Sequence, residues 1–213
     1  MRPYRRRAIL MQLALIIFLT FAFNNVMATE EPEYQVLERN GDFELRQYKP
    51  YIIAETLVEG DFQDVGNEGF RRLFDYISGK NLKKQSIPMT APVTQEAASE
   101  KIPMTAPVTQ EKAGEKWRIA FVMPSRSSLA TLPEPLDSII KLKEIPARLM
   151  AAVRYSGTWS RGRYEDKEKS LREFIRQKAL KIVGEPVWAR YNPPFMPWFL
   201  RRNEVLIPVE RTS

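Results

Sequence analysis

The chain has 213 residues, of which 44% are hydrophobic and 28% charged, and it contains neither Cys nor His. This is the composition of a globular protein with a sizeable core, while the two missing residue types exclude disulfides, His bases and Cys/His metal sites. Without residues 1–28 the net charge falls from +7 to +3, because 29 basic residues then face 26 acidic ones. That small excess does not indicate nucleic-acid binding, which requires a clustered basic face.

The first 28 residues have the pattern of a secretory signal peptide. A basic stretch, Arg5–Arg7, precedes the apolar stretch Ala8–Phe23, and the small residue Ala28 ends the segment. The apolar stretch is shorter than the roughly 20 residues that a membrane-spanning helix needs. We therefore expect residues 1–28 to be a cleaved signal peptide and the protein to be exported, either periplasmic or membrane-associated. An uncleaved membrane anchor is the alternative.

The remaining chain predicts strands interrupted by two amphipathic helices. The first helix carries apolar residues at i, i+3, i+4 and i+7 between Phe70 and Ile77, and the second is expected over Tyr164–Val183. Alternating or β-rich segments predict strands at residues 34–39, 43–48, 51–58, 117–123, 138–144, 148–155, 187–191 and 204–209.

A ten-residue phrase, IPMTAPVTQE, occurs twice, at Ile87–Glu96 and at Ile102–Glu111. Two copies are too few for a solenoid, so we expect them to form the two arms of one hairpin. Their prolines cannot donate to a sheet ladder, which predicts a position at an edge or rim. Met89 and Met104 are predicted to lie in the core rather than to bind a ligand.

The order of elements repeats itself. Residues 34–123 and 138–210 each place strands before and after one helix, and a Pro- and Ser-rich linker at 124–137 joins these halves. We expect an α+β fold with mainly antiparallel strands, in which a helix from each half covers a shared sheet or barrel. Because each half is small, we expect residues 32–210 to form a single domain.

Several short motifs, in their order and spacing, resemble the SOUL haem-binding protein family, and the chain is identified as a bacterial, exported member. They are GFRRL at 69–73, the doubled MTAPV, the segment from Trp117 through FVMPS, the LP and Pro135 run at 132–135, ARYNPP at 189–194 and RRNEV at 201–205. The resemblance implies a twisted, mainly antiparallel β-barrel with two α-helices and an internal pseudo-repeat, and it implies haem as the ligand.

The resemblance also places a tetrapyrrole in a groove between the first helix and the loop before the last strand. It implies apolar contacts from Phe70, Phe74, Ile77, Phe195, Met196, Trp198 and Phe199. It implies propionate partners at Arg71 and Arg201, with Arg72 and Arg202 beside them. Because the chain has no His for the iron, we expect an exported haem or tetrapyrrole carrier that uses apolar contact and propionate pairing. Other iron ligands to consider are Met89, Met104, Met196, Tyr76 and Tyr191.

Two other functions stay open. The loop Asn192–Phe199 concentrates apolar residues and prolines where a surface loop is expected, which indicates a binding rim or a membrane-facing surface. In the first alternative, the protein binds another flat hydrophobic molecule. In the second, it is an envelope interaction protein whose Pro193–Phe199 loop touches a membrane or a partner. Residues 1–28 offer a second possible membrane contact. We do not expect an enzyme, since the sequence has no nucleophile elbow, phosphate loop or metal cluster. We also expect no nucleic-acid partner. Trp198 is expected to contribute more than Met104 to binding.

Overall fold

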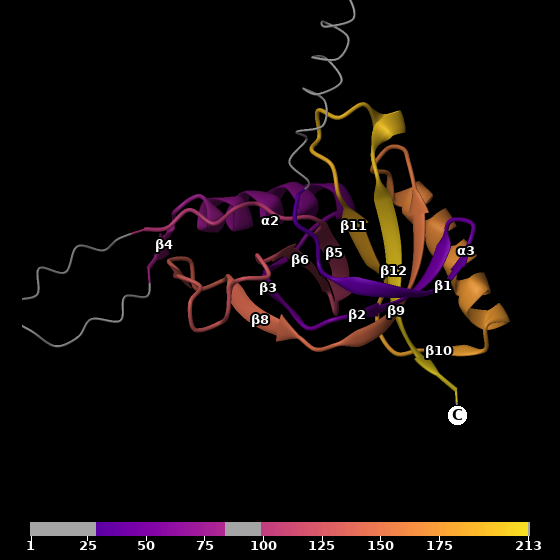
Figure 1. Ribbon diagram of the computed structural model, residues 1–213. Helices are drawn as coiled ribbons and strands as arrows, with labels where there is room; N and C mark the ends of the chain where they lie inside the picture. The colour runs from indigo at the N-terminus through magenta and orange to yellow at the C-terminus, as the bar shows by residue number, and fades with distance from the viewer. Residues whose placement is uncertain (1–28, 84–98, 213) are drawn as a thin grey trace, which may run out of the picture.

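A computed structural model describes residues 29–83 and 99–212 of the chain (Figure 1). The predicted signal peptide and the first copy of the repeated phrase lie outside the described residues. The fold is α+β, with two α-helices and a mostly antiparallel sheet of ten strands. Within the described part of the chain, neither helix is long and apolar enough to cross a membrane.

The elements closely follow the predicted order. They are β1 (Tyr34–Asn40), β2 (Phe43–Tyr48), β3 (Tyr51–Val58), α2 (Phe62–Ile77), β4 (Asn81–Leu82), β5 (Val108–Ala113), β6 (Lys116–Val122), β7 (Glu134–Pro135), β8 (Lys141–Ile145), β9 (Arg148–Tyr155), α3 (Arg161–Gln177), β10 (Leu180–Ile182), β11 (Val187–Arg190), the 3₁₀-helix η1 (Trp198–Leu200) and β12 (Asn203–Arg211).

The sheet has a symmetric strand order, β1-β2-β9-β12-β11-β5-β6-β3-β8, with β10 on β12. Its centre is the antiparallel pair β5 and β11. From there, β6 and β3 of the first half extend in one direction, and β12 and β9 of the second half extend in the other. The outer strands are exchanged, because β2 pairs with β9 while β8 pairs with β3. This arrangement is an internal pseudo-repeat in which each half completes the other's sheet.

The described strands do not close into a barrel. Their order starts at β1 and stops at β8, and no pairing between these two strands is present in residues 29–83 and 99–212. The mainly antiparallel sheet and the two helices are thus confirmed, whereas a closed barrel is not.

Helix α2 packs on β3 and β6, and α3 packs on β9, β10 and β12 (Figure 1). Helix α2 packs closely against β6 because residue 69 is a glycine. A Cβ atom at Gly69 would lie only 2.4 Å from Cγ1 of Ile119 on β6. Leu73, Tyr76 and Ile77 complete the buried face of the helix. Gly79 follows the helix with a φ of 118°, a conformation that glycine adopts without strain.

The second helix is shorter than predicted. It ends at Gln177, and the chain reverses at Ala179, whose φ is 51°. Leu180–Ile182 then forms β10 against β12 instead of another helical turn. The apolar residues that suggested a continuing helix therefore belong to a strand, because pairing with β12 satisfies the backbone of this segment.

The hairpin prediction for the repeated phrase is wrong for its second copy. Val108–Glu111 lies in β5, with β6 on one edge and β11 on the other. Both edges of the strand are therefore filled, and none remains for pairing with the first copy. The prolines do have the predicted effect, because Ile102–Pro107 runs outside the sheet before β5 begins.

Candidate functional site

A groove with a volume of about 470 Å³ lies between three segments that are distant in sequence. Helix α2 forms one wall, the second copy of the repeated phrase forms another, and the segment following β11 forms the third. The residues lining it are Thr29, Gly66, Asn67, Phe70, Met104, Thr105, Ala106, Val108, Trp159, Arg190, Tyr191, Asn192, Pro193, Pro194 and Phe195. Most of this surface is apolar.

The wall formed by α2 is aromatic. Phe70 stacks on Phe74 with ring centroids 5.8 Å apart, and it meets Phe121 edge-on at 5.2 Å. Phe70 is therefore anchored to the core while part of its ring faces the groove. Phe74 is exposed beyond it and extends the aromatic surface. Ile77, by contrast, is only 3% exposed and packs in the core, so the structure does not bring this predicted contact residue to the groove.

The repeated phrase supplies the second wall. Ile102 is buried, and its N–H donates to the carbonyl of Ile77 at 2.8 Å. The Thr105 hydroxyl donates to the carbonyl of Val122. Between these two anchors Met104 points outward and is 42% exposed, so the prediction that it lies in the core is wrong. The phrase thus contributes to the groove, because burial of Ile102 and Thr105 on either side leaves Met104 facing it.

Arg190 is the cation of the groove. Its Nε donates to the Tyr164 hydroxyl at 3.1 Å and its Nη2 donates to Oε1 of Gln110 at 2.9 Å. Both partners are neutral, and no carboxylate of the described residues forms an ion pair with this guanidinium. Gly66 provides the room for it, because a Cβ atom there would lie 3.1 Å from Nη1 of Arg190. A positive charge thus borders an apolar groove without an internal counter-ion.

The loop after β11 is held in a fixed shape by Arg201. Its Nε donates to the carbonyl of Met196 at 2.8 Å, and its Nη2 donates to the carbonyl of Pro194 at 2.6 Å. The Arg201 guanidinium also lies 4.5 Å from the ring centre of Trp159. The Arg190 guanidinium lies 5.2 Å from the same ring centre. Arg201 is therefore engaged in positioning the loop, although it was expected to pair with a propionate.

The structure brings together only part of the predicted site. Phe70 and Phe195 line the groove, and Phe74 adjoins it. Met196, Trp198 and Phe199 belong to the same loop but lie outside the lining, and the last two are 57% and 58% exposed. Arg71 is exposed on α2 one residue after Phe70, and it makes no ion pair with any described residue.

Sequence reasoning missed several residues of the groove. Gly66, Asn67, Trp159 and Arg190 were not proposed, Tyr191 appeared only as a possible iron ligand, and Met104 was expected in the core. Arg190 and Tyr191 belong to the ARYNPP motif, which was used for the resemblance but not for the site. Trp159 carried no signal of its own, because its place in the groove depends on a hydrogen bond from its Nε1 to Oδ1 of Asn203, at 2.8 Å.

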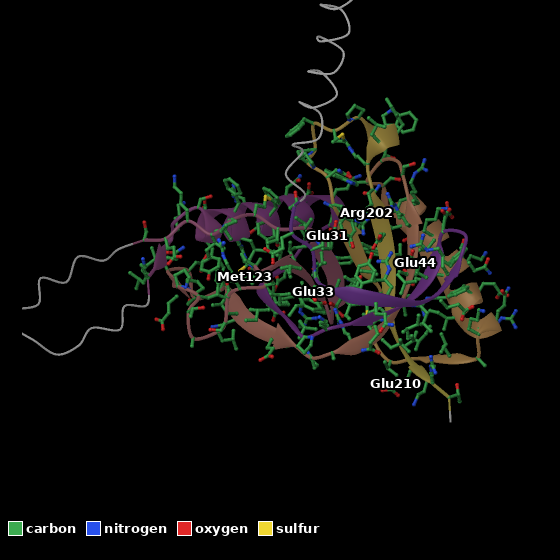
Figure 2. All side chains as sticks on the ribbon, viewed as in Figure 1. Glu31, Glu33, Glu44, Met123, Arg202 and Glu210 are labelled. Atoms are coloured by element: carbon green, nitrogen blue, oxygen red, sulfur yellow. The ribbon has the colours of Figure 1, made fainter. Side chains whose placement is uncertain are left out.

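A buried ionic network lies behind the groove. The Tyr191 hydroxyl donates to Glu204 at 2.8 Å. Glu204 is fully buried and receives two hydrogen bonds from Arg46, at 2.6 and 3.1 Å, and an ion pair from Arg202 at 2.9 Å. Arg202 reaches Glu31 at 2.8 Å, and Arg46 reaches Glu44 at 2.6 Å; Figure 2 labels Glu31, Arg202 and Glu44 along this chain of charges.

The network fixes the ionisation of its members. Burial alone raises the pKa of Glu204, but the hydrogen bond and charge of Arg46, together with the charge of Arg202, outweigh it and hold the pKa below its usual value. Burial, reinforced by the Glu204 charge, raises the pKa of Tyr191 well above its ordinary value. Tyr191 therefore stays a neutral donor and positions the start of the loop.

A family model described as "SOUL heme-binding protein" matches residues 29–99 and 94–208, and each stretch contains one copy of the repeated phrase. "Heme-binding protein 2" of Homo sapiens is 27% identical over 191 residues, covering 83% of this chain and 88% of that protein. "Heme-binding protein 1" of Xenopus laevis is 26% identical over 164 residues, covering 76% of this chain and 81% of that protein.

Solved structures share the fold at much lower identity. The C-terminal domain of EcmrR has a TM-score of 0.52 at 13% identity, and the match covers 84% of this chain and 99% of that one. A structure described as a hydrolase from Listeria innocua has a TM-score of 0.51 at 11% identity, covering 82% and 94%. These likenesses show the architecture alone. With the family model spanning nearly all of residues 29–208, the chain belongs to the SOUL haem-binding protein family.

Proposed function

We propose that this protein binds haem or a related tetrapyrrole in the groove beside α2. One observation carries the proposal: an apolar groove of about 470 Å³ is bordered by Arg190, whose charge has no carboxylate partner among the described residues. The volume falls within the roughly 300–1,000 Å³ typical of small-molecule sites. A flat apolar ring system with acidic substituents matches this combination, and haem is the ligand named by the family description.

The residues present divide into two roles. Phe70, Met104 and Phe195 offer apolar contact to the ring faces, and Arg190 and Arg71 offer charge to the propionates. When bound, haem would supply an iron that prefers a nitrogen, sulfur or oxygen ligand from the protein. The chain has no His. The thioether of Met104 faces the groove, whereas the Tyr191 hydroxyl is committed to Glu204. Binding therefore depends on the walls and the propionate partners.

A titration of the purified full-length protein with ferric haem tests this proposal. We expect the Soret band to shift and to saturate near one equivalent of haem. The same titration with protoporphyrin IX, which has no iron, should give a similar affinity, since no strong iron ligand is available. Free-haem spectra that persist at high protein concentration would refute the proposal, and a much weaker binding of protoporphyrin would show that iron ligation dominates.

We further propose that the protein is exported and contacts a membrane through its apolar loop. Phe195 is 85% exposed, and Trp198, Phe199 and Leu200 are also exposed beside it. Thr29, the first described residue, borders the same groove as Phe195, so the described part of the chain begins next to this loop. Sedimentation with anionic lipid vesicles checks the proposal: replacing Phe195, Trp198 and Phe199 with Ser should abolish it in protein that lacks residues 1–28. If the truncated protein sediments equally with and without the three Ser substitutions, the loop is not the membrane contact.

A further inference from the structure

A second hollow, with a volume of about 300 Å³, lies on the face of the sheet opposite the helices. Alternating residues of β3, β5, β6, β8 and β9 line it, because successive side chains of a strand point to opposite faces. On β5, Val108 borders the groove beside α2, whereas its neighbour Thr109 borders this second hollow, called the cleft below. The two sites therefore lie back to back, and Tyr191 borders both.

The cleft has an apolar, aromatic interior. Met150, Val187 and Leu206 form a buried cluster with Tyr48, separate from the main core, and Tyr51 packs against this cluster. The rings of Tyr48 and Tyr51 lie 6.2 Å apart with their planes inclined at 54°. Neither helix covers this cluster, because α2 and α3 pack on the other face of the sheet. The arrangement offers an aromatic surface to a small flat molecule.

The charges of the cleft are incompletely paired. Arg118 lies 3.0 Å from Glu55 and 2.9 Å from Glu111, so one cation serves both carboxylates. Arg148 donates to the Tyr51 hydroxyl and lies 5.7 Å from the centre of its ring. Its buried Nε atom has no hydrogen-bond partner, and although its charge acts on Glu111, no carboxylate of the described residues comes within ion-pair distance of it. A buried guanidinium N–H without a partner is costly unless a ligand accepts from it.

We propose that the cleft binds a small aromatic acid, with its ring on the tyrosine and apolar surface and its carboxylate or sulfonate on Arg148. Lys143, which lines the cleft and is exposed, adds a second positive charge near the acid group. The cleft volume lies at the lower end of the range for small-molecule sites, which suits a ligand of one or two rings rather than a tetrapyrrole. The site is thus separate from the proposed haem groove.

Calorimetric titration of the full-length protein with 2-naphthoate tests the proposal. Arg148→Met removes the anion partner and should weaken 2-naphthoate binding about tenfold or more, as expected for a lost charge-assisted hydrogen bond. Arg148→Lys, which keeps the charge, should restore part of the affinity. Lys181→Met removes an exposed charge from β10, outside the cleft lining, and should change the affinity less than about twofold. Protonated 2-naphthylmethylamine, of similar shape but opposite charge, should bind much more weakly than 2-naphthoate.

Three results would overturn the proposal: no measurable 2-naphthoate binding, an unchanged affinity in Arg148→Met, or equal binding of the cationic probe. Lys143→Met provides an independent check, since this exposed side chain does not support the core, and it should cause a smaller loss than Arg148→Met. Met104→Ala, in the groove beside α2, should leave 2-naphthoate binding intact. A loss of 2-naphthoate binding in Met104→Ala would instead place the probe in that groove.

Discussion

The groove beside α2 and the cleft on the opposite face of the sheet are built differently. Irregular segments and one helix form the groove, which is the larger and more apolar of the two. Strands form the cleft, and their alternation brings Glu55, Glu111, Arg118 and Arg148 to its surface. In each site one arginine lacks a carboxylate partner among the described residues: Arg190 in the groove and Arg148 in the cleft. The two sites thus share an arginine without an ion-paired carboxylate among the described residues, but they differ in size.

The two sites also differ in what fixes their shape. The paired strands fix the shape of the cleft through their register, so its size is limited by the sheet itself. The groove depends on how the loop after β11 and the Ile102–Pro107 segment are held, by Arg201 and by Thr105 respectively. The wall between the two sites depends on Tyr191 and Glu204. Breaking each of these supports in turn tests the comparison.

The largest effect is expected from the buried network behind the shared wall. Arg46→Met removes both hydrogen bonds to Glu204 and leaves a buried carboxylate less compensated. We expect the free energy of unfolding, measured in urea, to fall by about 3–5 kcal/mol. Arg39→Met is the matched control, because Arg39 is exposed and pairs with Glu44 at the edge of the network. Arg39→Met should lower the free energy of unfolding by less than about 1 kcal/mol. An equal loss in both variants would contradict the role of burial.

The same network predicts how stability depends on pH. The pKa of Glu204 is held below its ordinary value, so its stabilising contribution is complete above about pH 4.3, the pKa of an unfolded glutamate. That contribution is lost as the pH falls through the lower pKa of the folded state. Glu204→Gln should therefore show a flatter decrease in unfolding free energy between about pH 5 and pH 3 than the wild type. Parallel curves would show that other carboxylates control acid unfolding.

A smaller effect is expected where the repeated phrase supports the groove. Gln110 is buried, donates to the carbonyl of Phe62 at 2.9 Å and accepts from Arg190. Gln110→Ala leaves both partners without this hydrogen bond and should cost about 2 kcal/mol of unfolding free energy. Gln63→Ala is the matched control, because Gln63 is exposed on α2. We expect it to change stability by less than about 0.5 kcal/mol, and a comparable loss in both variants would contradict the role of the buried hydrogen bonds.

The smallest expected effect concerns haem contact in the groove. Met104→Ala removes an apolar wall and should weaken ferric haem binding about fivefold to tenfold, measured from the Soret change. Trp198→Ala alters the exposed part of the loop outside the lining, so, contrary to the order expected from the sequence, it should weaken binding less than Met104→Ala. The opposite order would place haem on the outer face of the loop.

The strands and the first helix were predictable because each carries a local pattern. Phe43–Tyr48, Tyr51–Val58 and Arg148–Tyr155 have the bounds that alternation and the Pro interruptions predicted. The short strands β4 and β7 were not predicted, because they have only two residues each and depend on pairing with one another. The exchange of strands between the halves could not be predicted either, since local sequence does not determine which strand pairs with which.

The site was less predictable than the fold. Helical spacing places Phe70, Phe74 and Ile77 on related faces of α2, but it does not reveal that Ile77 packs in the core while Phe74 stays exposed. The importance of Arg190 follows from its neutral partners Tyr164 and Gln110, which come from other elements of the fold. Met104 was assigned to the core because its alternation was taken as that of a strand. The prolines beside it prevent this, so the side chain faces the groove.

The position of bound haem tests the account most directly. Ferric haem is paramagnetic, so it should broaden the amide resonances of nearby residues in a ¹⁵N-labelled sample, whereas a gallium protoporphyrin control should only shift them. We predict the strongest broadening at Phe70, Met104 and Phe195, with the signals of Tyr51 and Arg148 largely preserved. Broadening centred on Tyr51 and Arg148 would contradict the assignment of haem to the groove and would place it in the cleft on the opposite face of the sheet.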